Sequence, residues 1–238
     1  MNFQDVVNQN LPGMLNETLF MSQLKSNLRR LGFTANNTIT CVSTCRDELC
    51  RQFHHTMDEQ WGEAFNFSSL AGFLSLGETG FSAAIKHAPK ERDKQRFLFV
   101  VMPHIAIDLD GRCGKIIRNG HRKPTSACGA LVTAHSFLKS NIQAQFNPRD
   151  PEQSLLQMRL QQALNGKPIP GILPLTQLTH QLIKQDLENF IDTFLDQGMV
   201  DYTVVSGIQV HGPSNSGFVW PGGCYAMVDG QRHAITLS

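Results

Sequence analysis

One unbroken apolar run, RFLFVVMPHIAID at residues 96–108, constrains the fold of this chain more than any other segment. Apolar residues follow one another there without the alternation typical of a half-exposed strand, which predicts a strand covered on both faces, as in a parallel sheet. Pro103 cannot donate a hydrogen bond to a strand ladder, so His104 should lie just beyond the carboxyl end of this strand. The run therefore predicts an α/β fold in which helices flank a mainly parallel central sheet.

Periodic and turn-forming residues elsewhere in the chain predict the helices and the other strands. Apolar residues three and four positions apart from Phe20 to Leu31 predict an amphipathic helix that ends at Gly32. Further helices are predicted at about 47–62, 128–138, 151–166 and 176–198, and further strands at about 37–45, 201–212 and 215–230. No repeat or linker divides the 238 residues, so we expect a single domain over 1–238 that begins with a helical segment at about 1–33.

Charge and hydropathy exclude several classes of partner. The formal net charge is +1 and the pI is about 7.7, so neither nucleic acid nor an anionic membrane surface is an expected partner. No apolar run approaches the roughly 20 residues needed to cross a bilayer, and the first residues lack the basic and apolar regions of a signal peptide. We therefore expect a cytoplasmic protein, or one of an organelle stroma if a targeting peptide has been removed.

The stretch CVSTCRDELC at 41–50 holds three of the six cysteines of the chain. Six cysteines in a chain of this length are too few for a disulfide-stabilised scaffold, which leaves free thiols or metal ligands. Cys41, within a predicted strand, and Cys50, on the apolar side of a predicted helix, fit core packing because free cysteine is among the most buried residue types. A thiol redox sensor built from Cys41, Cys45 and Cys50 is a weaker alternative.

Three cysteine and histidine positions fall where a ligand site is expected in a parallel sheet. Ligands bind in the crevice outside the carboxyl ends of the strands. Cys45 and His104 follow predicted strands and Cys128 opens a predicted helix, so the three can converge there. Two thiolates and one imidazole suit Zn²⁺, and three protein ligands leave one position open for catalysis. The local zinc patterns CxxC and HExxH are absent, as are the P-loop, GxSxG and zinc-deaminase motifs, so the residues alone leave this site a hypothesis.

Five blocks of sequence point to a known family. They are CRDEL (45–49), AFNFSSLAG (64–72), MPHIAID (102–108), ACGAL (127–131) and GIQVHGP (207–213). They closely resemble the limiting-CO2-inducible protein B/C family, which comprises β-carbonic-anhydrase-like proteins first associated with algal CO2-concentrating mechanisms. The resemblance implies a β-carbonic-anhydrase-like fold, a homodimer, and a zinc ion held by the residues that match the family's ligands, Cys45, His104 and Cys128.

The resemblance also implies catalytic groups beside the zinc. Asp47 matches the aspartate of the CxDxR pattern of β-carbonic anhydrases, whereas Leu49 stands where that pattern has its arginine. Arg46 is therefore the expected catalytic partner of Asp47, with Arg51 in reserve. The implied function is that of a zinc-dependent carbonic anhydrase, a lyase in which zinc-bound hydroxide reversibly hydrates CO2 to bicarbonate and a proton. The alternative is a catalytically silent zinc protein that binds CO2 or bicarbonate, or serves as an assembly component, in inorganic-carbon metabolism.

Two further features of the site stay open on the sequence alone. Phe65, Phe67 and Leu70, from AFNFSSLAG, either form the apolar wall of a CO2 pocket or pack in the core. The histidines at positions 54, 55 and 87 either relay the released proton or are ordinary surface residues.

Overall fold

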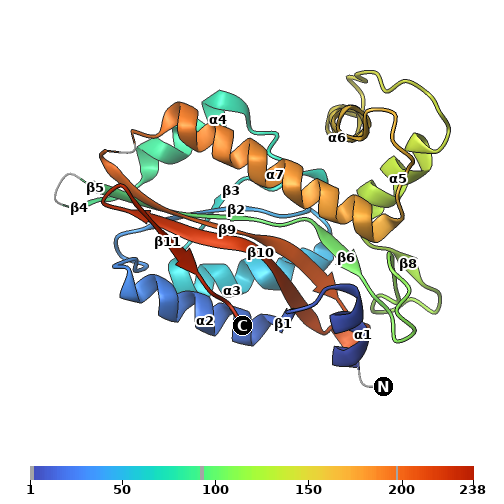
Figure 1. Cartoon of the computed structure of the whole chain (residues 1–238), viewed down its shortest axis with the longest axis horizontal. Coiled ribbons are helices and arrows are strands. Elements are labelled where there is room, and N and C mark those ends of the chain that lie inside the picture. The colour runs from blue at the N-terminus through green and yellow to red at the C-terminus, as the bar shows by residue number, and fades with distance from the viewer. Residues whose placement is uncertain (1–2, 92–93, 197) are drawn as a thin grey trace.

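The computed structural model describes residues 3–91, 94–196 and 198–238 (Figure 1). Nine strands of this described part form one sheet, whose main path runs β1, β10, β9, β5, β2, β3. The strands on the path are β1 (Leu15–Asn16), β2 (Ile39–Ser43), β3 (Phe65–Asn66), β5 (Lys94–Val101), β9 (Val200–His211) and β10 (Gly217–Val228). Off the path, β4 (Lys90–Glu91) pairs with β5, β6 (His104–Ala106) with β9, and β11 (Gln231–Ile235) with β10.

The centre of the sheet is parallel. Strands β3, β2, β5 and β9 are parallel neighbours, and β6 pairs with β9 in the same direction. On the other side of β9, β10 returns antiparallel, and β1 and β11 pair antiparallel with β10. The predicted α/β fold with a mainly parallel centre is confirmed. Ser43 at the end of β2 lies opposite Val101 at the end of β5, so the segments that follow both strands leave from the same edge of the sheet.

Helices cover both faces of the sheet (Figure 1). One face is covered by α2 (Glu17–Arg30) and α3 (Arg51–Trp61), and the other by α4 (Gly77–His87) and α7 (Ile172–Phe194). The remaining helices are α1 (Phe3–Asn10) near the ends of β9 and β10, and α5 (Gly129–Leu138) and α6 (Pro151–Leu164) beside α7. Short 3-10 turns are η1 (Glu48–Cys50), η2 (Leu70–Gly72) and η3 (Pro213–Asn215). Among the helices in the described ranges, none is long and apolar enough to span a lipid bilayer.

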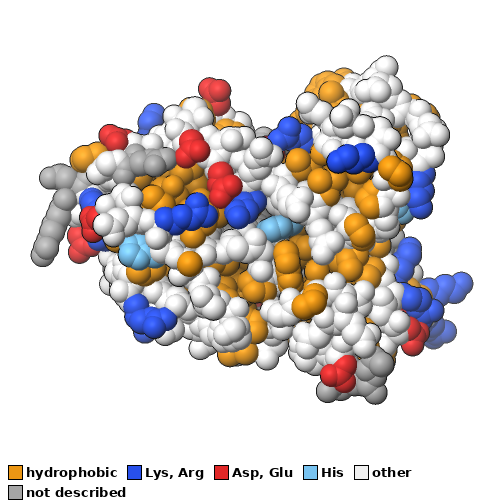
Figure 2. All heavy atoms as spheres, viewed as in Figure 1, with side chains coloured by type: hydrophobic (Ala, Val, Ile, Leu, Met, Phe, Trp, Pro, Cys, Tyr) orange, Lys and Arg blue, Asp and Glu red, His pale blue; other side chains and the backbone are white. Residues whose placement is uncertain are grey.

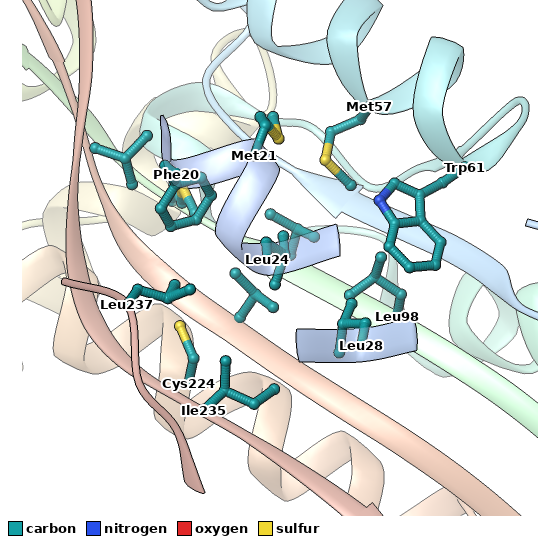
Figure 3. Packing of buried hydrophobic residues seen from close by; sticks show 14 of the residues in the cluster. Phe20, Met21, Leu24, Leu28, Met57, Trp61, Leu98, Cys224, Ile235 and Leu237 are labelled. Carbon is teal, nitrogen blue, oxygen red and sulfur yellow. The ribbon is translucent and has the colours of Figure 1, made fainter. Parts of the chain in front are cut away.

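Strand β5 shows why its sequence does not alternate. Phe97 and Phe99 pack in the cluster beneath α4 and α7, whereas Leu98 and Val100 pack in the cluster beneath α2 and α3. Figure 3 shows that second cluster, in which Leu24, Leu28, Met57 and Trp61 surround Leu98. Each such buried side chain stabilises the fold by about 1.5–3 kcal/mol. Both faces of β5 are therefore core, as the apolar run predicts.

Pro103 separates β5 from β6. Strand β5 ends at Val101, and the chain resumes pairing at His104, which lies opposite Gln209 of β9. The Gln209 amide N–H donates to the Pro103 carbonyl oxygen at 3.0 Å, so β9 supports the break. His104 thus lies beyond the end of β5, as predicted, and is held by a short strand of its own.

Candidate metal centre

Cys45, His104 and Cys128 come together at the edge of the sheet. One ligand atom from each lies within 4.8 Å of the others, and the two Sγ atoms are 3.5 Å apart. All three side chains are buried. The sequence therefore predicted three residues that the structure assembles into one cluster, although they are spread over 84 positions of the chain.

The local backbone fixes each of these side chains differently. Cys45 follows β2 and forms an isolated parallel bridge with Ser69, and the Ser43 hydroxyl donates to the carbonyl oxygens of Phe67 and Gly72. Cys128 is the N-cap residue of α5, and its side chain makes no capping bond. The hydrogen bond to Cys45 and burial raise the pKa of Cys128, so without a metal this side chain is the thiol of the pair and would have to lose its proton to bind a metal.

The chemistry of the group fits zinc. The Cys128 thiol donates toward Cys45, which lowers the pKa of Cys45 to about 4 against the opposing effect of burial. His104 Nε2 is buried and has no hydrogen-bond partner among the described residues. Tetrahedral Zn²⁺ with Zn–S bonds of about 2.3 Å would place two sulfurs about 3.8 Å apart, close to the separation seen here. Cys45, His104 and Cys128 are the residues that would hold the ion.

Asp47 and Arg118 form an ion pair beside this cluster. Arg118 Nη1 and Nη2 donate to Asp47 Oδ1 and Oδ2 at 2.8 and 2.9 Å, and Asp47 Oδ2 lies 3.8 Å from His104 Nε2. Burial acts to raise the pKa of Asp47, but the hydrogen bonds and positive charge of Arg118 hold it well below its usual range. Asp47 is therefore an ionised carboxylate at neutral pH, directed toward the cysteine–histidine group.

Every N–H donor of Arg118 has an acceptor. Besides the two bonds to Asp47, Nε donates to Thr125 Oγ1 at 2.8 Å, Nη2 to the Ser126 carbonyl oxygen at 2.8 Å, and Nη1 to Glu48. A guanidinium has five N–H groups, so none is left for a substrate. Arg118 can orient and ionise Asp47, but it has no free donor with which to bind a ligand.

The prediction that Arg46 pairs with Asp47 is wrong. Arg46 Nη2 lies 2.7 Å from Glu152 Oε1, and its Nε donates to the Ser68 carbonyl oxygen at 3.1 Å. The Arg46 side chain is 60% exposed, whereas that of Arg118 is 15% exposed. Arg46 and Asp47 lie in a bend before η1, and the bonds to Glu152 and Ser68 hold the Arg46 side chain away from its neighbour.

Sequence reasoning also missed two residues beside His104. His211 Nε2 lies 3.1 Å from His104 Nδ1, and Cys50, His104 and His211 form a second group of buried side chains with metal-ligand spacing. Cys50 is buried, as predicted, but it lies beside a polar imidazole as well as in an apolar cluster. His211 stands in the GIQVHGP block, which was the available signal for it. The only sequence signal for Arg118 was its place in a basic, turn-rich segment that precedes Cys128.

Two pockets open beside the cluster. One, of about 380 Å³, is lined by Cys45, Asp47, His54 and neighbouring polar residues. The other, of about 430 Å³, includes Leu49, Arg118 and His211 in its lining. Cys45 and Asp47 therefore reach solvent through the first pocket.

One of the two alternatives left open for Phe67 is favoured by its position. Phe67 is buried in the core cluster under α4, with its ring 6.0 Å from that of Phe81, so core packing is the better interpretation of that residue. The apolar lining beside Arg118 comes instead from Leu49 and Ile116.

A mainly parallel α/β sheet with a cysteine–histidine–cysteine group at its edge defines a β-carbonic-anhydrase-like protein. The model of the limiting CO2-inducible proteins B/C β-carbonic anhydrases matches residues 14–228, and the chain belongs to that family. The chain is similar to the crystal structure of limiting CO2-inducible protein LCIB, with 27% identity over 100% of both chains and a TM-score of 0.82. It shares its fold with PtLCIB4, a homologue of LCIB, at 23% identity over 98% of this chain and 99% of that one, with a TM-score of 0.83. No curated protein sequence matches the chain closely.

Proposed function

We propose that this protein is a zinc-dependent carbonic anhydrase that interconverts CO2 and bicarbonate. The observation that carries the proposal is the ionised Asp47–Arg118 pair beside Cys45, His104 and Cys128. Two thiolates and one neutral imidazole form a ligand set typical of catalytic zinc, with a fourth position left for water. Family membership supports the same assignment.

In this proposal the metal and the Asp47 carboxylate have different roles. Bound zinc supplies a nucleophile at neutral pH because it lowers the pKa of its water to about 7. Asp47 accepts a hydrogen bond from the attacking oxygen, which orients a lone pair of that oxygen toward the carbon of CO2. Arg118 keeps Asp47 ionised and unable to rotate, since it binds both carboxylate oxygens.

The product proton leaves toward the 380 Å³ pocket. His54 is half-buried in that lining and its Nε2 lies 2.6 Å from Thr44 Oγ1 and 3.2 Å from Ser68 Oγ. Burial lowers the pKa of His54, so it is a neutral base at physiological pH. His54, one of the histidines that the sequence offered as proton acceptors, shares this pocket with Asp47.

We further propose that the active form is a homodimer. Leu109 and Ile117 are 64% and 59% exposed, and both line a pocket of about 480 Å³ next to the segment that carries Arg118. Figure 2 shows hydrophobic side chains gathered on the molecular surface below the α5–α6 lobe. Exposed apolar surface of this kind is stabilised by association, and light scattering at micromolar concentration tests for the dimer.

Stopped-flow CO2 hydration on protein of known zinc content tests the enzymatic proposal. Asp47→Ala should lower kcat/KM by about 10²–10⁴-fold, the usual contribution of a positioned proton acceptor. Zinc-loaded wild type that hydrates CO2 no faster than Asp47→Ala would refute catalysis. That result would instead support the silent CO2-binding or bicarbonate-binding component.

A further inference from the structure

The two ring nitrogens of His104 have different surroundings. Nε2 faces Asp47 and makes no hydrogen bond with a described residue, whereas Nδ1 lies 3.1 Å from His211 Nε2. Both imidazoles are buried, at 0% and 8% exposure, and their rings meet edge to face at 73°. Water therefore has little access to the contact between them.

The sheet places these two rings together. His104 lies opposite Gln209 in the pairing of β6 with β9, and His211 lies opposite Ala106 two positions along. Side chains two positions apart in a strand share a face of the sheet, so both imidazoles project to the same side. The Ile107 amide N–H donates to the His211 carbonyl oxygen at 3.0 Å, which anchors the backbone of His211.

The location of the proton on each ring decides which histidine donates this hydrogen bond. Two imidazole nitrogens at hydrogen-bond distance share one proton, and a neutral imidazole carries its proton on one nitrogen only. If His104 carries the proton on Nδ1, it donates to His211, and Nε2 is free to bind a metal. If His211 donates instead, the proton of His104 lies on Nε2 and blocks the metal ligand.

We propose that His211 is a positioning residue that holds His104 in the Nδ1-protonated tautomer and so presents Nε2 to the metal. The inference rests on the proposed zinc site. Metal-binding histidines usually donate their second N–H to a carboxylate, a carbonyl or water, and loss of that partner costs about 10–100-fold in metal affinity. Here the acceptor is a second imidazole. His211 accepts the hydrogen bond at Nε2, so its own single proton is on Nδ1.

Zinc affinity measured by competition with a chromophoric chelator tests the proposal without any enzymatic readout. His211→Phe keeps an aromatic ring but removes the acceptor, so its zinc Kd should rise about 10–100-fold. His211→Gln restores an acceptor oxygen and should recover most of that loss. His233→Gln, on β11, is the matched control and should bind zinc like wild type. Equal zinc affinity in wild type and His211→Phe would overturn the proposal.

A measurement on unmodified zinc-loaded protein keeps the test independent of variant folding. Nitrogen-15 NMR of the imidazoles should show His104 protonated on Nδ1 and His211 unprotonated on Nε2. The opposite tautomers would overturn the proposal.

The second cysteine–histidine group provides the competing location for the metal. If zinc is lost in Cys50→Ser but retained in Cys128→Ser, the ion is bound by Cys50, His104 and His211, and the positioning role is refuted. If the affinity pattern holds but wild type does not hydrate CO2, the carbonic anhydrase proposal fails and the role of His211 stands.

Discussion

Replacing Arg118 by methionine should strongly reduce the proposed CO2 hydration while leaving Cys45, His104 and Cys128 in place. Methionine keeps an unbranched side chain but has none of the five N–H donors of Arg118. Asp47, whose side chain is only 10% exposed, would lose both of its bonds to the guanidinium. Breaking a buried pair by removing one partner costs about 3–5 kcal/mol of folding stability, because the remaining charge is left without compensation.

The same substitution should change how stability depends on pH. A carboxyl whose pKa is lower in the folded than in the unfolded state stabilises the fold above its ordinary pKa of about 3.9, and this stabilisation disappears as pH falls toward the folded value. The pKa of Asp47 is depressed in this way. The stability difference between wild type and Arg118→Met should therefore be largest near pH 7 and should shrink below about pH 4, as measured by urea unfolding.

The assay for function is stopped-flow CO2 hydration at equal zinc content, with Arg46→Met as the matched control. Arg118→Met should lower kcat/KM by about 10²–10⁴-fold, because Asp47 loses its charge partner and its orientation. Arg46→Met removes an exposed ion pair, worth about 0.2–1 kcal/mol, and should cost less than about fivefold. A loss in Arg46→Met as large as that in Arg118→Met would refute the assignment drawn from the geometry.

Three other predictions concern the metal ligands and the contact between α7 and β10. Cys45→Ser should bind no zinc, whereas Cys41→Ser, which changes a core residue, should keep one zinc ion per chain. Plasma emission measurements that find zinc in both variants would contradict the ligand assignment. Burial, aided by the charge of Lys184, lowers the pKa of His180 to about 4. The unfolded state therefore binds a proton at higher pH than the folded state, and the free energy of unfolding should fall by about 3 kcal/mol as pH drops from 6.5 to 4. In urea titrations, His180→Leu should lack this contribution to the pH dependence of stability. A Cβ on Gly222 would lie 2.3 Å from two His180 ring atoms, so Gly222→Ala should lower the free energy of unfolding by about 1–3 kcal/mol. Adding His180→Ala to that variant should recover stability. Equal loss of stability in the single and the double variant would exclude the clash.

The elements that the sequence predicted well are a strand buried on both faces and helices whose buried residues recur every three or four positions. The run around Leu98 predicted the central strand because helices cover both of its faces, and the spacing from Phe20 to Leu28 predicted α2 because that stripe packs on the sheet. Strand β11 was missed, because its residues are mostly exposed and their pattern carries little apolar signal. Its position depends on pairing with β10, which no local pattern encodes.

Part of the candidate metal site could be predicted from the positions of strand ends, whereas the choice of Cys45, His104 and Cys128 as a zinc set came from the family resemblance. Cys45 and His104 follow strands that are in register, so their convergence follows from the parallel sheet. The partner of Asp47 could not be predicted in this way. Arg118 reaches it across 71 positions from a turn-rich segment, where apolar periodicity gives no information. Sequence adjacency favoured Arg46, and the three-dimensional path of the chain placed Arg118 there instead.

The arginine that binds Asp47 lies on a small hairpin beside the main sheet. Arg118 lies between β7 (Lys115–Ile116) and β8 (Thr125–Ser126), which form a two-stranded sheet separate from the main one and joined by two residue pairs. Segments with few contacts open locally at lower free energy than the whole fold. Heating should therefore release Arg118 before the main sheet unfolds, leaving a temperature range in which the main sheet is folded but the Asp47–Arg118 pair is lost. If the proposed activity holds, its loss on heating would follow the opening of this hairpin, and stabilising the hairpin would raise the temperature of that loss without any change to the core.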